Sequence, residues 1–185
     1  MNHDHFMALA LQEAEQALNN GEFPVGCIIS DGKTVIASGR RTATVKARPN
    51  EIDHAEINAL RTLDNLSSST SSAAGDLTLY CTLEPCLMCF GAILLSGIHT
   101  IVYAYEDVMG GGTICDLSQL PPLYKNKDIS LVKGIMRSRS LELFARFFMK
   151  PDNTYWKDSL LSRYTLAEQK KSLEKSARRY ALHIG

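Results

Sequence analysis

Apolar residues recur in alternating helical and strand-like patterns over the first half of the chain. Between about residues 5 and 19 they follow a helical spacing among glutamates, and Gly21 marks where an amphipathic helix should end. Two apolar runs, residues 24–29 and 34–37, flank the pair Asp31-Gly32. That arrangement predicts a β-hairpin.

The second half continues the alternation. Helical spacing recurs over residues 54–63 and 141–148, and strand-like runs cover residues 77–81, 99–105 and 129–132. Pro85 is expected to open a helix that ends at Gly97, and one or two helices are expected between residues 155 and 182. Residues 40–53 read as irregular, and the serine-rich stretch 66–76 as an exposed, mobile connection. Strands that alternate with helices predict an α/β fold whose sheet is covered by helices on both faces.

The length of the chain fits one compact domain. Its 185 residues are enough to bury a sizeable core. Residues 1–150 are expected to form this domain, and residues 151–185 a C-terminal helical extension.

Composition and charge exclude several classes of protein. Hydrophobic residues make up 45% and charged residues 22%, as in ordinary globular proteins, and the formal net charge is zero. There is no basic excess of the kind that marks nucleic-acid binding, although the last 23 residues hold six basic and two acidic side chains. No apolar stretch approaches the length of a membrane span, and the first residues lack the layout of a secretory signal, so we expect a cytoplasmic protein without membrane contact. The odd number of cysteines, five, argues against a disulfide framework.

A histidine and a C-x-x-C pair form the strongest chemical motif. Cys86 and Cys89 are three residues apart, so on a helix they share one face and can bind a single ion. Together with His54 they make a thiolate and imidazole set that suits Zn²⁺. Three protein ligands leave the fourth tetrahedral position open, which is typical of a catalytic zinc site.

The order His54-Ala55-Glu56, then Pro85-Cys86 and Cys89, matches the H-x-E…P-C-x-x-C signature of zinc deaminases. In that signature the glutamate is not a ligand. The resemblance implies that zinc activates a water and that Glu56 carries its proton to the ring and then to the departing amine.

Each of these residues alone has a simpler explanation. The C-x-x-C pair is also compatible with redox chemistry or chance, and His54 with a packed or surface histidine. Asp53-x-x-Glu56 resembles a helix capping box, which would make Glu56 structural. Their occurrence together, on the expected elements, favours the catalytic site.

From about Phe6 to Phe148 the chain resembles the cytidine-deaminase-like superfamily, and within it bacterial tRNA adenosine deaminases and related small nucleobase deaminases. The matching segments are residues 23–27, 54–60 and 79–93. The resemblance implies a three-layer α-β-α sandwich with a central five-stranded mixed sheet, and a homodimer. It also implies backbone contacts to the base from Ala55 and Glu84, and a pocket lined by Phe23 and Val25. A purely structural, apolar role for Phe23 is equally compatible with the sequence.

The chain departs from the family pattern at three places. Arg41 stands where relatives usually carry an asparagine that contacts the substrate, and Asn50 in the following loop is a possible spatial substitute. Asp107 matches the family, but the arginine that precedes it in the tRNA enzymes is Glu106 here. Residues 151–158 loosely resemble the segment that caps the pocket of fungal cytosine deaminase, which would place Trp156 over the substrate; a packing anchor for the terminal helix is the alternative.

Three hypotheses about function follow. The first is a tRNA wobble adenosine deaminase. The second is a deaminase of a free base or nucleoside such as cytosine, guanine or adenine, which the altered residue 41 and the possible Trp156 cap would suit. The third is a zinc-binding or assembly protein without activity, which the intact Glu56 argues against.

Overall fold

The structure, a computed structural model, describes residues 2–45, 48–66 and 77–181. The serine-rich connection lies almost entirely outside the described residues. The helices are α1 (His3–Asn19), α2 (Ala55–Leu66), α3 (Leu87–Ser96), α4 (Pro122–Lys125), α5 (Arg137–Phe148) and α6 (Leu160–Ala181), with a 3-10 turn η2 at Leu117–Gln119. The strands are β1 (Gly26–Ser30), β2 (Val35–Arg40), β3 (Thr78–Leu83), β4 (Thr100–Tyr105) and β5 (Ser130–Lys133).

The five strands form one mixed sheet in the order β2-β1-β3-β4-β5. Strand β1 is antiparallel to both of its neighbours, whereas β3, β4 and β5 run parallel. Every residue of β1 and β3 is buried, because the apolar segments of these strands face helices on both sides. The predicted five-stranded mixed sheet is confirmed.

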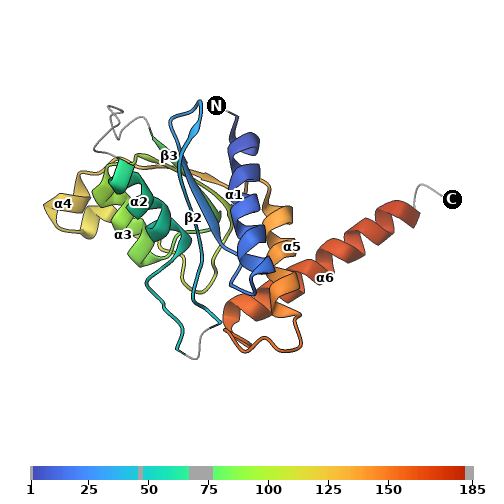
Figure 1. Ribbon diagram of the computed structural model, residues 1–185. Coiled ribbons are helices and arrows are strands. Elements are labelled where there is room, and N and C mark those ends of the chain that lie inside the picture. Colours follow the sequence, from blue (N-terminus) through green and yellow to red (C-terminus); the bar gives the residue numbers. More distant parts are fainter. Residues whose placement is uncertain (1, 46–47, 67–76, 182–185) are drawn as a thin grey trace.

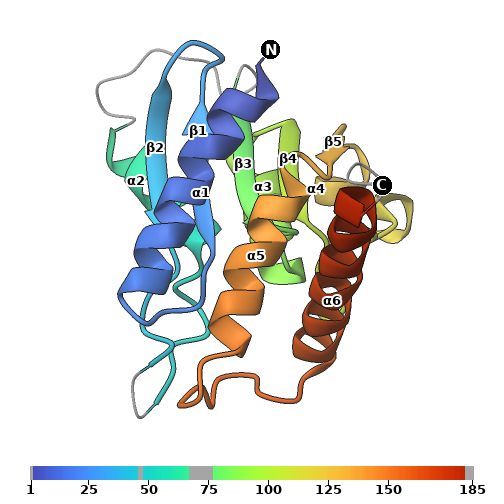
Figure 2. The same ribbon diagram turned by 90° about the vertical axis from the view of Figure 1, so that its right-hand side faces the viewer.

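Helices cover both faces of this sheet. Figure 1 shows α2 and α3 on one side and α1 and α5 on the other, and Figure 2 shows α1 and α5 side by side on the latter face. Helix α1 contacts β1 and β3, and α2 contacts β2 and β1. The expected three-layer sandwich is therefore confirmed.

The local signals for the ends of elements were mostly correct. Gly97 follows α3 in the left-handed region, with φ of 78°, a conformation that glycine adopts without steric cost. Gly21, just after α1, is also left-handed, and Asp31 caps the hairpin turn by accepting from the backbone N–H groups of Lys33 and Thr34. Pro85, however, does not open α3: Cys86 is the N-cap, in extended conformation, and the helix begins at Leu87.

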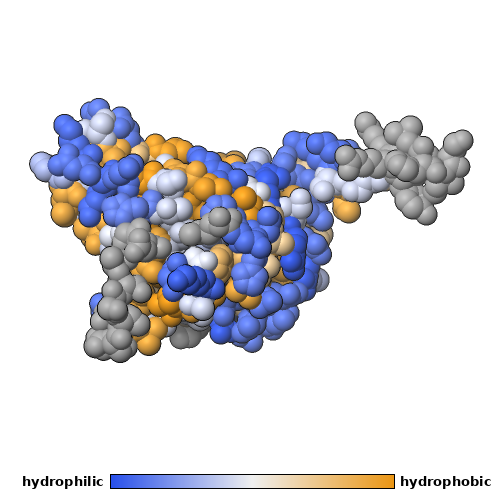
Figure 3. All heavy atoms as spheres, turned by 90° about the horizontal axis from the view of Figure 1, so that it is seen from above, coloured by the Kyte–Doolittle hydropathy of each residue, from blue (hydrophilic) through white to orange (hydrophobic). Residues whose placement is uncertain are grey.

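The C-terminal segment first packs against the body of the molecule and then projects away from it. Residues 151–159 are irregular, so the helix expected from residue 155 begins only at Leu160. Helix α6 packs on α5, and Figure 1 shows its C-terminal part projecting away from the body. The part of this projection that is coloured in Figure 3 is mainly hydrophilic. The division at residue 150 stays a prediction. No helix within the described ranges is apolar enough over sufficient length to cross a bilayer.

Candidate metal and active site

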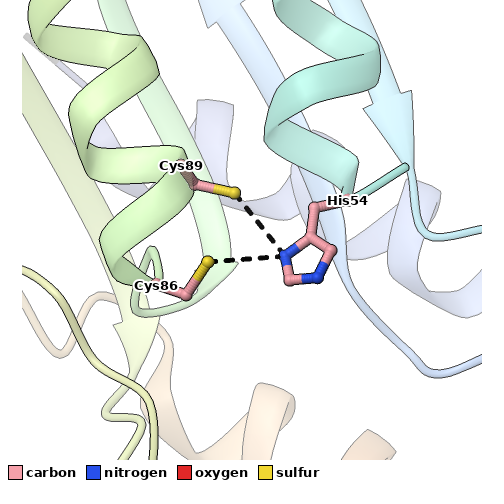
Figure 4. Close-up of side chains that lie close together, drawn as sticks. All are labelled: His54, Cys86 and Cys89. Atoms are coloured by element: carbon pink, nitrogen blue, oxygen red, sulfur yellow. Dashed lines mark hydrogen bonds between the residues drawn. The ribbon is translucent and has the colours of Figure 1, made fainter. Parts of the chain in front are cut away.

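His54, Cys86 and Cys89 come together between the starts of two helices. His54 immediately precedes α2, and the two cysteines stand at the N-cap and in the first turn of α3 (Figure 4). The His54 Nδ1 atom lies 3.6 Å from the Cys86 Sγ atom and 3.5 Å from the Cys89 Sγ atom. A tetrahedral zinc with Zn–S near 2.3 Å and Zn–N near 2.0–2.1 Å requires an N–S separation of about 3.6 Å. The three side chains therefore fit one zinc ion.

The surroundings of the two thiols suit metal binding. The hydrogen bond from Cys89, followed by that with His54, lowers the pKa of Cys86 to about 4 against the effect of burial. The hydrogen bond to Cys86 and burial raise the pKa of Cys89. The lowered pKa of Cys86 favours its thiolate form, and the positive end of the α3 dipole favours a second thiolate once a cation is present.

Glu56 lies in the first turn of α2 and is buried, with 3% of its surface exposed. Burial raises its pKa, although the nearby His54 opposes this. Its Oε2 atom has no hydrogen-bond partner among the described residues. The capping-box bond is not formed, because the backbone N–H of Asp53 donates to Asn50 instead. Within the part of the chain that the structure describes, the Glu56 Oε2 atom is therefore a buried oxygen that a water or a substrate could satisfy.

A small cavity connects these groups. Its free volume is about 60 Å³, and its walls include all of the predicted site residues except Cys89, which is buried beside it: Phe23, Val25, Arg41, His54, Ala55, Glu56, Glu84, Cys86, Asp107 and Trp156. Leu83, Gly110 and Tyr155 complete the walls. Positions spread over more than 130 residues of sequence thus meet at one place.

Aromatic residues close the cavity on one side. Tyr155 and Trp156 stack with ring centroids 5.2 Å apart and an interplanar angle of 9°, and both rings contact Phe23. Phe23 also packs against the aromatic residues of α5, so its pocket role and its structural role coexist. We call Tyr155 and Trp156, with the segment 151–158 that carries them, the aromatic cap.

Arg41 lies under this cap. Its side chain is only 2% exposed, and its Nη2 atom donates to Glu51 Oε2 at 2.8 Å and to the Tyr155 hydroxyl at 3.2 Å. The Tyr155 hydroxyl in turn donates to the same Glu51 oxygen at 2.9 Å. Asn50 does not replace the missing family asparagine: its side chain bonds Ile52 and Asp53 within its own turn and is absent from the cavity wall.

Glu84 and Asp107 also line the cavity, and hydrogen bonds hold their carboxyl groups in place. The Glu84 carboxylate accepts from the Thr113 hydroxyl and from the backbone N–H of Asp107. The Asp107 carboxylate accepts from the backbone N–H groups of Met109 and Gly110. The Glu84 backbone N–H donates to the Tyr105 carbonyl. If the backbone of Glu84 contacts the base, as the family resemblance implies, the contact must therefore come from the Glu84 carbonyl oxygen.

Sequence reasoning missed Glu51 and Tyr155. Neither of them is among the site residues that the sequence predicts. The only sequence signal for Tyr155 was its place in the 151–158 segment. For Glu51 there was none, because its partner Arg41 stands ten residues away and is buried only in the folded chain.

The fold and site define a zinc-dependent hydrolase class in which a histidine and two cysteines hold the metal beside a buried glutamate. Comparison with known families assigns the chain further. Residues 1–105 match the cytidine and deoxycytidylate deaminase zinc-binding region, and the chain belongs to this family. It is a zinc-dependent hydrolytic deaminase.

Two of the relatives that the chain matches are named as tRNA-specific adenosine deaminases. The chain is 34% identical to the tRNA-specific adenosine deaminase of Agrobacterium fabrum over 149 residues, covering 78% of this chain and 92% of that protein. It is 32% identical to tRNA-specific adenosine deaminase 2 of Xenopus laevis over 150 residues, covering 78% of this chain and 85% of the relative.

Solved structures show the same fold. A structure from a study of A-to-I editing by tRNA:A34 deaminases is 32% identical and superposes with a TM-score of 0.61, covering 75% of this chain and 98% of that one. A guanine deaminase from Nitrosomonas europaea superposes with a TM-score of 0.60 at 21% identity, covering 78% of this chain and 83% of that chain. The second likeness concerns the fold alone.

Proposed function

We propose that this chain deaminates adenosine in tRNA, with His54, Cys86 and Cys89 as zinc ligands and Glu56 as the proton carrier. One observation carries the catalytic assignment: the buried Glu56 Oε2 atom lacks a partner among the described residues, beside three side chains spaced for zinc. A buried acceptor without a partner is costly unless a ligand or water supplies a donor. The named relatives support tRNA as the substrate.

The proposed roles follow from the chemistry of hydrolytic deamination. Zinc, when bound, supplies a Lewis acid that makes water a nucleophile near neutral pH. Glu56 takes a proton from the attacking water, delivers it to the ring nitrogen, and then moves a proton to the leaving amine. The C–N bond breaks, a carbonyl forms, and ammonia leaves. The raised pKa of Glu56 suits a group that must hold a proton between these steps.

The test is inosine formation in an anticodon stem-loop that carries adenosine at the wobble position. Glu56→Gln should keep zinc and lose activity by about 100-fold or more. Glu142→Gln on helix α5, outside the cavity wall, is the matched control and should leave the rate unchanged. A wild-type protein that forms no inosine in any tRNA overturns this substrate.

A second candidate, a free base or nucleoside, is favoured by the aromatic cap. With the cap in place the cavity offers about 60 Å³, well below the roughly 300 Å³ at which ligand pockets begin. Tyr155 and Trp156 also line a neighbouring open groove of about 760 Å³, so their displacement would join the two spaces. A cap of this kind encloses a small substrate more readily than a base within a polynucleotide.

Ammonia release across a panel of free bases and nucleosides tests this candidate. Turnover of one panel member with no inosine in tRNA would establish the small substrate. If no panel member releases ammonia while RNA is deaminated, this candidate is rejected.

We further propose that the chain is a homodimer. Exposed apolar side chains cluster around the start of α3 and the loop that packs on it, where Gly112 donates to the Pro85 carbonyl: Leu87, Val108, Met109 and Ile114. An apolar patch of this kind favours a protein partner. Sedimentation should give a dimer mass for the wild type and a monomer for Ile114→Lys, whereas Leu173→Lys on the projecting part of α6 should stay dimeric.

A cytoplasmic location stays a prediction, supported by the thiol chemistry. Cys86 and Cys89 must remain reduced to bind zinc, and Cys27 and Cys81 are free buried thiols, which suits a reducing compartment. Fractionation of cells that express a tagged chain would test it.

A further inference from the structure

Among the described residues, Arg41 is the only arginine in the wall of the metal-site cavity, and one nitrogen of its guanidinium group, Nη1, lacks an acceptor. It follows strand β2, and its backbone N–H donates to the Val25 carbonyl, which fixes the direction of the side chain. Nη2 makes both protein contacts, to Glu51 and Tyr155. Nη1 is buried, and no described residue accepts a hydrogen bond from it.

An unpartnered guanidinium nitrogen at this position requires an acceptor. Arginine side chains only donate hydrogen bonds. Burial without an acceptor costs free energy that a ligand can recover. Arg41 lines the same cavity as His54, Glu56 and Cys86, so a substrate bound in that cavity can supply the acceptor that Nη1 lacks.

We propose that Arg41 Nη1 is a specificity-determining donor that binds an acceptor atom of the substrate, either a carbonyl oxygen or an unprotonated ring nitrogen. This inference rests on the proposed deaminase function and narrows its substrate. A base that turns an N–H group toward Arg41 is rejected, because the two donors would oppose each other.

Charge disfavours a phosphate at this position. The Arg41 cation is already paired with Glu51 at 2.8 Å, and the remaining wall carries the carboxyl groups of Glu56, Glu84 and Asp107. A phosphate in the cavity would face these three groups, and the described wall offers no unpaired arginine to balance it. The group that enters is therefore a neutral base, as a free base or with its sugar outside the cavity.

Equilibrium binding tests this without turnover. Zinc-loaded Glu56→Ala protein is titrated with adenine, guanine, cytosine, their nucleosides and 5′-monophosphates. The tightest base is then compared with analogues in which each ring nitrogen or carbonyl oxygen in turn is replaced by C–H. The same series is measured with the Glu56→Ala/Arg41→Met double variant, whose zinc content and thermal unfolding report whether it folds.

In the Glu56→Ala protein, which keeps Arg41, one analogue should bind about tenfold more weakly than its parent base. In the double variant, the affinities of the same analogue and its parent should agree within about twofold. A Glu56→Ala/Tyr155→Phe variant keeps Nη1 and should retain the tenfold difference. The inference is overturned if no acceptor shows an Arg41-dependent loss, if the 5′-monophosphates gain affinity through Arg41, or if no base or nucleoside binds.

Failure of the inference and failure of the proposed function are separable. Deamination by wild-type protein, measured on tRNA and on the small-molecule panel, tests the function without reference to Arg41. If the enzyme is active but the weaker binding of the analogue persists in the Arg41→Met background, only the inference about Arg41 is overturned. If the wild-type protein deaminates none of these substrates, the proposed function is overturned.

Discussion

Gly39 on strand β2 and Ala55 at the start of helix α2 are in direct contact. A Cβ atom added at Gly39 would lie 2.3 Å from the Ala55 carbonyl oxygen and 2.4 Å from the Ala59 backbone nitrogen. Only glycine permits this approach. The contact sets the position of α2, and with it His54 before the helix and Glu56 in its first turn.

Gly39→Ala should therefore destabilise the fold by about 1–3 kcal/mol, because backbone on both sides must move. Zinc affinity should fall with it, since His54 shifts relative to the two cysteines. Gly91→Ala is the matched control: a Cβ there meets nothing within 4 Å, and alanine favours a helix by up to about 1 kcal/mol. Chemical denaturation of both variants measures the difference, and equal stabilities would contradict the contact.

Metal removal should lower stability. His54→Ala deletes one of three ligands and should reduce bound zinc from one per chain to a small fraction, because zinc then keeps two protein ligands. A chelator should lower the melting temperature of the wild type but not that of His54→Ala, because binding to the folded state stabilises it by mass action. Elemental analysis and thermal scans measure both effects. Cys115→Ser, a free cysteine outside the cluster, should behave as wild type.

The Tyr155 hydroxyl ties the aromatic cap to the loop that carries Glu51. Tyr155→Phe removes this hydroxyl but keeps the ring stacked on Trp156, so local opening of residues 151–158 should become easier by about 1 kcal/mol. Hydrogen exchange of this segment should accelerate about fivefold. Tyr124→Phe on α4 is the control and should leave exchange in residues 151–158 unchanged; an unchanged rate in Tyr155→Phe would show that stacking alone holds the cap.

Glu106 provides a pH-dependent contribution to stability. Burial raises its pKa, but the hydrogen bonds from Arg137 and Tyr164 outweigh this and lower the pKa below its usual value. A carboxylate with a lowered folded-state pKa stabilises the protein above its unfolded-state pKa of about 4.3, and this stabilisation is lost as the pH falls through the folded-state value.

Glu106→Gln should therefore cost about 1 kcal/mol or less at pH 7, since the side chains of Glu106 and Arg137 are each 32% exposed and solvent screens the pair. The difference from wild type should vanish toward pH 3. Free energies of unfolding across this range measure it. A difference that stays constant with pH would assign the effect to packing of α6 rather than to charge.

The sequence by itself determined the sheet, most helices and the metal ligands, because each depends on short-range patterns. Helical and strand periodicity reflect burial of one face, and glycines such as Gly97 mark backbone that other residues avoid. The spacing of Cys86 and Cys89 places them at the N-cap and in the first turn of one helix. Chemistry then limits what a histidine and two thiols can bind.

Only the tertiary structure decided the surroundings of Arg41. Its Nη2 atom, which is paired with Glu51, also meets the hydroxyl of Tyr155, 114 residues away in the chain. Nothing local favours that approach; it follows from how α5 and the start of α6 pack and return residues 151–159 to the site. Long-range packing is decided by the combined burial of many side chains, and so the cap, the closed cavity and the unused donor appear only in the folded molecule.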